Sequence, residues 1–234
     1  MARSKKRKPG LLLRVTGAFV LTLLIIPVLQ VAAVRWHTPR HSTVMWQRSL
    51  QYPDWPREHR PVPLESLPRD LVWFVILSED GRFFQHQGFD MIEAQKALSS
   101  AREPGSKPRG ASTITMQTAR SLFLWQGRSH LRKALEIYYA FWMERLLNKR
   151  RILELYLNFM ETGPGVYGME AGAWHHFDQS TQALSKKEKA MLVAILPNPL
   201  NWSPRQPSPR VILRQKRILE RAVRWRAPAE LESL

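Results

Sequence analysis

The longest apolar stretch lies near the start of the chain. Residues 15–34 contain no charged side chain, and residues 1–14 contain six basic residues and no acid. About 20 apolar residues suffice for a membrane-spanning helix, and a basic flank predicts that this end stays in the cytoplasm. We expect a cytoplasmic tail (1–14), a transmembrane anchor (15–34) and a remainder outside. A cleaved signal peptide is the alternative, although its apolar region normally has only about 7–15 residues.

Beyond residue 65 the apolar positions recur at the spacing of helices. In residues 129–149 they are separated by three or four residues, the stripe of an amphipathic helix. Ser129, Asp90 and Ser185 stand at predicted helix N-caps. Strand signals are few, so the sequence predicts a mostly α domain. The other expected helices are 68–80, 90–101, 118–124, 149–160, 169–178, 185–197 and 210–226.

Three segments lack this period. Prolines interrupt the connector (35–64), which we expect to be irregular and either to rest its tryptophans on the membrane or to be a plain linker. Prolines and glycines predict a loop over 102–117, and glycines after residue 161 predict a break in regular structure up to residue 168. The sequence therefore indicates one globular domain from residue 65 to residue 234.

The net charge of +17 indicates an anionic partner. Lipid headgroups, a diphosphate or nucleic acid satisfy the charge, but a domain outside the cytoplasm without a recognition motif argues against nucleic acid. The chain has no cysteine, which excludes disulfides, thiolate metal sites and thiol nucleophiles.

Two acidic positions are candidates for chemistry. Glu79 and Asp80 follow an apolar run, where a poorly solvated carboxylate is a stronger base, or where the pair is a solvated helix end. Glu136 lies one helical turn from Arg132 and Lys133, an arrangement typical of surface ion pairs or of a site for a metal or a diphosphate. Two more arginines, Arg120 and Arg128, add guanidinium groups suited to phosphate oxygens.

Histidines offer less. His86 is a candidate ligand or base, but a lone histidine among aromatic residues is more often a hydrogen-bonded core residue. No histidine pair has the spacing of a zinc site.

Five segments together resemble the peptidoglycan glycosyltransferase family, which includes the first domain of class A penicillin-binding proteins. They are EDGRFFQHQGFD, GASTITMQTARSLFL, RKALE, KRRILELYLN and GPGVYGMEAGAWHHF, within about residues 65–222. The short remainder leads us to expect no transpeptidase domain, as in the monofunctional members, which have one N-terminal anchor.

The resemblance implies a lysozyme-like fold that polymerises lipid II into β-1,4-linked glycan strands with inversion, releasing undecaprenyl diphosphate. Glu79 would be the base and Glu136 the second catalytic acid. The residues that would bind substrate are Asp80, Phe83, His86, Ser112, Thr113, Gln117, Arg120, Arg128, Arg132 and Lys133. No cofactor is firmly required; Glu136 would orient either the basic residues or a divalent ion, Mg²⁺ or Mn²⁺. The implied location is a Gram-negative inner membrane, with a periplasmic domain and proteins of cell-wall synthesis or division as partners.

Two positions depart from the family pattern. Met116 stands where the family has a glutamine, and Ala111 where it has a glycine. Two rival functions follow from the same sequence: a lysozyme-like hydrolase, and an inactive membrane scaffold with a basic face. The many arginines argue against a hydrolase, because a neutral sugar leaving group needs no such charge.

Overall fold

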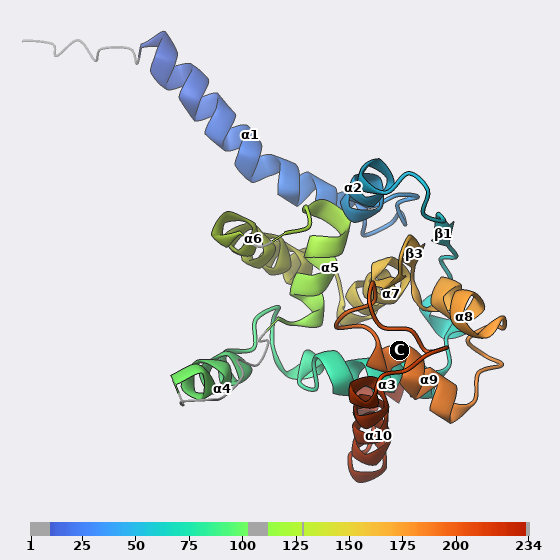
Figure 1. Ribbon diagram of the computed structural model, residues 1–234. Coiled ribbons are helices and arrows are strands. Elements are labelled where there is room, and N and C mark those ends of the chain that lie inside the picture. The colour runs from blue at the N-terminus through green and yellow to red at the C-terminus, as the bar shows by residue number, and fades with distance from the viewer. Residues whose placement is uncertain (1–9, 103–111, 128, 233–234) are drawn as a thin grey trace, which may run out of the picture.

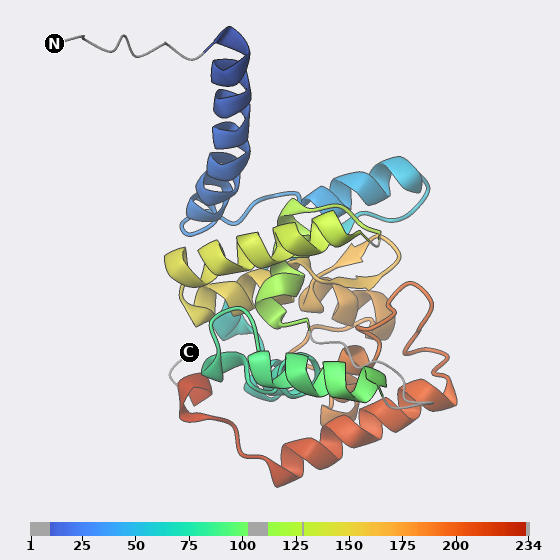
Figure 2. The ribbon, with the colours of Figure 1, turned by 90° about the vertical axis from the view of Figure 1, so that its left-hand side faces the viewer.

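Helices dominate the computed structural model, which describes residues 10–102, 112–127 and 129–232. One long helix, α1 (Leu11–Ala33), projects from a body formed by the other elements (Figure 1, Figure 2). Three short strands form one small sheet within the described residues. The predicted mostly α fold is confirmed.

The C-terminal part of α1 lies against the body, and the rest stands free. Val31 and Val34 are buried, and the Tyr138 hydroxyl donates to the Leu24 carbonyl at 2.9 Å. Nearer the N-terminus, large apolar side chains such as Leu21 are more than half exposed. The stretch Arg14–Ala33 has the length and hydropathy of a membrane span, two properties that a signal sequence shares.

The segment after α1 is more regular than its sequence indicated. Helix α2 (Thr43–Gln51) begins after Ser42, whose hydroxyl accepts from the Met45 backbone N–H at 3.2 Å. Val44 and Met45 are buried, so α2 belongs to the packed body. Pro39 and Pro53 flank this helix and led to the expectation of an irregular connector, which was wrong here.

Helix α3 (Arg69–Glu79) is the centre of the body. Every residue from Leu71 to Leu77 is buried, because α9 (Lys186–Ala194) and α10 (Pro209–Arg224) pack against it.

Helix α5 (Ile114–Phe123) packs between α6 (His130–Leu146) and α7 (Lys149–Phe159). It begins four residues before the predicted start, because Thr113 caps it by accepting from the Met116 N–H at 3.2 Å. The remaining helices are α4 (Met91–Arg102), α8 (Met169–Phe177) and α11 (Ala229–Glu232), with 3₁₀ turns at Leu64–Ser66 and Phe83–Gln85.

A small sheet replaces the expected break after residue 160. Strands β2 (Glu161–Gly163) and β3 (Val166–Tyr167) are antiparallel, and β1 (Glu58–His59) pairs with β3 in parallel. Gly165 turns the hairpin with a φ of +70°, and a Cβ there would lie 1.9 Å from the Pro56 carbonyl oxygen. Glycine therefore allows the hairpin and the connector to meet.

Candidate active site

Glu79 is held at the C-terminal end of α3 by groups from two other helices. The Arg214 guanidinium, on α10, donates to Glu79 Oε1 at 2.7 Å. Gln117 Nε2, on α5, lies 3.5 Å from Glu79 Oε2. The Glu79 side chain is 12% exposed. Its Oε1 is fixed by the ion pair with Arg214, whereas its Oε2 has only the long contact with Gln117.

Glu136 has a different environment in the second turn of α6. Its side chain is 1% exposed and forms an ion pair with Arg132. Lys133 Nζ lies 3.1 Å from Glu136 Oε2, and Arg120 Nη1 lies 4.0 Å from Oε1. One buried carboxylate thus meets three cations, which leaves a surplus of two positive charges. Arg128 lies outside the described residues.

Ser112 joins the surroundings of the two carboxylates. Its hydroxyl accepts from Lys133 Nζ at 2.8 Å, and its carbonyl accepts from Gln117 Nε2 at 3.3 Å. The Tyr156 hydroxyl donates to Gln117 Oε1 at 3.2 Å. Burial raises the pKa of Tyr156 well above its ordinary value, and the Glu79 carboxylate raises it further, so this hydroxyl stays protonated.

Four of the predicted site residues form a buried support for this cluster. Asp80 accepts from the Ile114 backbone N–H at 2.9 Å, at the start of α5, and from His86 Nε2 at 2.9 Å. A carboxylate at a helix N-terminus is favourable for the helix dipole. Thr113 caps the same helix and donates to the Gly88 carbonyl at 2.7 Å.

Phe83 is the fourth residue of this buried support, after Asp80, His86 and Thr113. Its ring is fully buried, with its centroid 4.5 Å from Lys149 Nζ. All four side chains face the core, so in this geometry they act by placing α5 and the turn after α3. Their part in substrate binding stays a prediction.

Two groups of side chains, the one around Glu136 and the one formed by Asp80, His86 and Asp90, do not fit a divalent cation. Mg²⁺ takes several oxygen ligands, whereas Glu136 is enclosed by cations. Asp80, His86 and Asp90 come within 4.8 Å of one another, but Arg82 Nε lies 3.0 Å from Asp90. Burial opposes charge on Asp90, yet the Glu93 backbone N–H and Arg82 lower its pKa overall. This group is therefore an ion-pair network.

Comparison with known proteins identifies the family. The family model described as Transglycosylase matches residues 47–223. A biosynthetic peptidoglycan transglycosylase of Pseudomonas aeruginosa is 40% identical over 88% of this chain and 90% of its own. Proteins of the same name from Aeromonas hydrophila and Nitrobacter winogradskyi are each 42% identical, over 83% and 85% of this chain and 83% and 87% of theirs. The chain belongs to the transglycosylase family.

The family match includes the site residues that sequence reasoning missed. Arg214 and Tyr156 both lie within it, on helices that the sequence predicted without assigning them a role. The available signal for Arg214 was a repeat of basic residues on α10 at 210, 214, 217, 221 and 224, which marks one helical face.

Met116, the departure from the family pattern, packs in the core. Its side chain is 1% exposed, and its sulfur lies 4.0 Å from Lys133 Nζ. Ser112 and Glu136 bind that ammonium group instead, so an amide at position 116 is not needed to hold Lys133. Ala111, the second departure, lies outside the described residues.

Proposed function

We propose that this transglycosylase joins lipid II units into β-1,4-linked glycan strands by an inverting transfer that releases undecaprenyl diphosphate. The observation that carries the proposal is the contrast between the two carboxylates. Glu79 has an oxygen with only one long contact, whereas Glu136 is buried among three cations. The first suits proton abstraction, and the second suits the organisation of positive charge.

Glu79 is the proposed general base. The ion pair with Arg214 fixes Oε1, which orients Oε2 toward the acceptor. That oxygen takes the proton of the acceptor sugar hydroxyl as the hydroxyl oxygen attacks the anomeric carbon of the donor. General-base catalysis needs such a group within hydrogen-bond reach of the proton that it removes.

The cations around Glu136 are the proposed site for the leaving diphosphate. Positive groups placed where negative charge develops stabilise a transition state most when they need no rearrangement. Glu136 holds Arg132 and Lys133 in place, and Arg120 completes the set. Arg128 is expected to add to it.

A hydrolase of similar fold is the rival function. Glycoside hydrolysis normally needs a carboxylic acid that protonates the leaving oxygen, opposite a second carboxylate. Glu136 is poorly placed to protonate a leaving oxygen, because both of its carboxylate oxygens already pair with cations. Diphosphate release in step with strand growth distinguishes the two functions.

The exposed part of α1 supports a membrane location. Tyr138 of α6 donates a hydrogen bond to the carbonyl of Leu24, which lies near the middle of the apolar stretch Arg14–Ala33, so α6 contacts α1 at that point. On α6 itself, Leu131, Ile137 and Phe141 are exposed. We propose a single-pass inner-membrane protein with its basic tail in the cytoplasm and its catalytic domain in the periplasm, partly sunk into the lipid. Proteins of cell-wall synthesis or division are its proposed partners.

Polymerisation of labelled lipid II by the full chain in detergent tests the proposal. Wild type should produce glycan strands and undecaprenyl diphosphate, and Glu79→Gln should produce neither. Glu220→Gln removes an exposed carboxylate on α10 and serves as the matched control with wild-type activity. Equal activity of wild type and Glu79→Gln would refute the assignment of the base, and an inactive wild type would favour the scaffold.

A further inference from the structure

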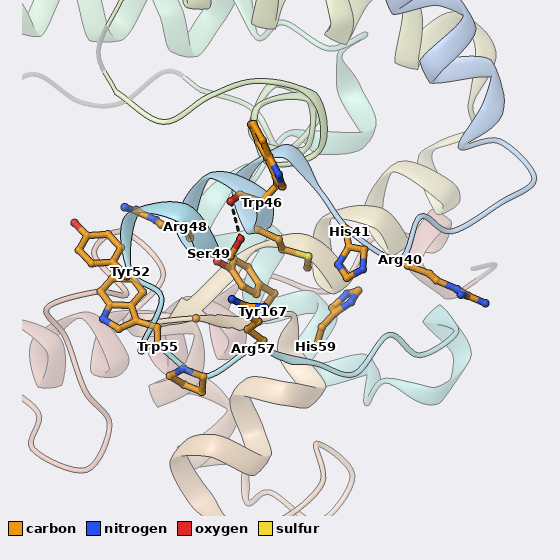
Figure 3. Close-up of a pocket in the computed structure, with 13 residues that line it drawn as sticks. Arg40, His41, Trp46, Arg48, Ser49, Tyr52, Trp55, Arg57, His59 and Tyr167 are labelled. Carbon is orange, nitrogen blue, oxygen red and sulfur yellow. Dashed lines mark hydrogen bonds between the residues drawn. The ribbon is translucent and has the colours of Figure 1, made fainter.

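One cavity of the structure shares no residue with the groups around Glu79 and Glu136. It has a volume of about 310 Å³ and lies between α2, the chain that follows it and the hairpin. Figure 3 shows Tyr167 and Arg57 between Trp55 on one side and His41 and His59 on the other. A cavity of this size is within the range of small-ligand sites.

Four aromatic side chains line the cavity: Trp46, Tyr52, Trp55 and Tyr167. Tyr52 and Trp55 stack with their ring centroids 3.9 Å apart. Trp46 of α2 also lines the cavity, and its side chain is largely exposed to solvent. The Gly165 turn, in close contact with Pro56, closes the cavity toward the hairpin. Such a wall accepts the apolar part of a ligand.

The charges at the cavity are unbalanced. The Arg48 guanidinium donates to both oxygens of Glu161, at 3.0 and 3.2 Å, and is thereby neutralised. Arg40 and Arg57 are exposed and have no carboxylate partner in the described part of the chain. Two free guanidinium groups beside an apolar cavity select an amphipathic anion, and guanidinium is well matched to phosphate.

The position of α2 indicates where such a ligand would come from. Helix α2 lies at the height of the lower end of α1 in both views, although in Figure 2 the connecting chain separates the two helices (Figure 1, Figure 2). Trp46 and Leu50, on α2, are 65% and 64% exposed. Tryptophan on a surface next to a membrane span is typical of the headgroup layer. The cavity is therefore next to the level at which phosphates of the bilayer would lie.

We propose that this cavity binds the headgroup of an anionic phospholipid, with Arg40 and Arg57 at its rim attracting the phosphate and with the glycerol and first acyl carbons against Trp46 and Trp55. The proposal rests on the proposed anchoring by α1. It gives the domain a second attachment to the membrane, on the α2 side of α1.

Native mass spectrometry of the full chain, released from detergent with equal amounts of phosphatidylglycerol and phosphatidylcholine, tests this. Wild type should retain phosphatidylglycerol over phosphatidylcholine by about tenfold, and Arg40→Gln/Arg57→Gln should lose most of that preference. Arg35→Gln/Arg145→Gln removes the same charge near the end of α1, outside the cavity, and should keep it. Ser49→Trp fills the cavity and leaves both arginines, so it should also lose the lipid.

Three results would overturn the proposal. Equal loss in Arg35→Gln/Arg145→Gln would mean that general surface charge holds the lipid. Retention in Ser49→Trp would mean that the cavity is not used. Farnesyl diphosphate that binds while phosphatidylglycerol does not would assign the cavity to a polyprenyl diphosphate. Lipid retention is measured without lipid II. A wild type that fails to polymerise lipid II would therefore refute the proposed function without contradicting the proposed lipid site.

Discussion

Replacing Glu136 with glutamine tests whether this buried carboxylate organises the cations. The substitution keeps the shape of the side chain and removes its charge. Arg132, whose side chain is 11% exposed, then has no anionic partner among the described residues, and Lys133 and Arg120 lose theirs as well. The positive groups would repel one another and move apart.

The size of the effect follows from the burial of the pair. Removing one partner of a buried ion pair costs about 3–5 kcal/mol, because the other charge stays desolvated. For a chain of this size about 1 kcal/mol corresponds to about 2–4 °C in Tm, so we expect a decrease of about 6–20 °C. Displaced cations would also stabilise the leaving diphosphate less, and we expect polymerisation to fall by at least about 100-fold, or about 2.7 kcal/mol.

Glu144→Gln is the matched control, because it separates stability from chemistry. Glu144 lies on the same helix, its side chain is 7% exposed, and it pairs with Lys149 at 2.8 Å, outside the cluster around Glu136. Thermal unfolding and lipid II polymerisation are measured for both variants in the same detergent, below both Tm values. Similar losses of Tm, with activity lost only in Glu136→Gln, are expected. Equal activity of the two variants would refute the reasoning.

Three further predictions concern single contacts. Arg214→Ala should lower the polymerisation rate about 10–100-fold in single-turnover assays, because a hydrogen bond to a charged group contributes about 1.5–3 kcal/mol and here orients Glu79; an unchanged rate would contradict this. Gly165→Ala should lower the Tm in detergent, since its Cβ would overlap the Pro56 carbonyl at a φ of +70°. Burial lowers the pKa of His176 below 6.5, so the folded state favours the neutral ring. The contribution of His176 to stability is full above about pH 6.5 and is lost as the pH falls through the lowered pKa. His176→Gln should therefore make the Tm depend less on pH between about pH 7 and pH 5 than it does in wild type.

Local signals in the sequence located most helices. Ser129 caps α6 as predicted, accepting from the Arg132 N–H at 3.4 Å, and Asp90 accepts from the Glu93 N–H at 3.0 Å before α4. Both caps act within one turn, so the chain itself carries the information. The small sheet was missed for the opposite reason, because Glu58 pairs with Val166 across more than a hundred residues. Strands of two or three residues leave no alternation to detect.

For the site too, contacts between residues close in sequence could be predicted, and contacts between distant residues could not. Arg132, Lys133 and Glu136 are one turn apart, so their cluster follows from helical spacing alone. The pair of Glu79 with Arg214 joins residues separated by 135 positions. Basic residues recur along one face of α10, and only the packing of α10 on α3 determines that position 214 meets the carboxylate.

The surroundings of the two glutamates assign them different tasks. Ion pairing is extensive at Glu136, where three cations and nearly complete burial hold the carboxylate in place. At Glu79 one guanidinium binds one oxygen, and the amide of Gln117 reaches the other only at 3.5 Å. A base must exchange its weak contact for a substrate proton without losing its orientation, and only Glu79 meets both conditions. Exchanging the roles would require Glu136 to give up an ion pair, which costs more than a long amide contact.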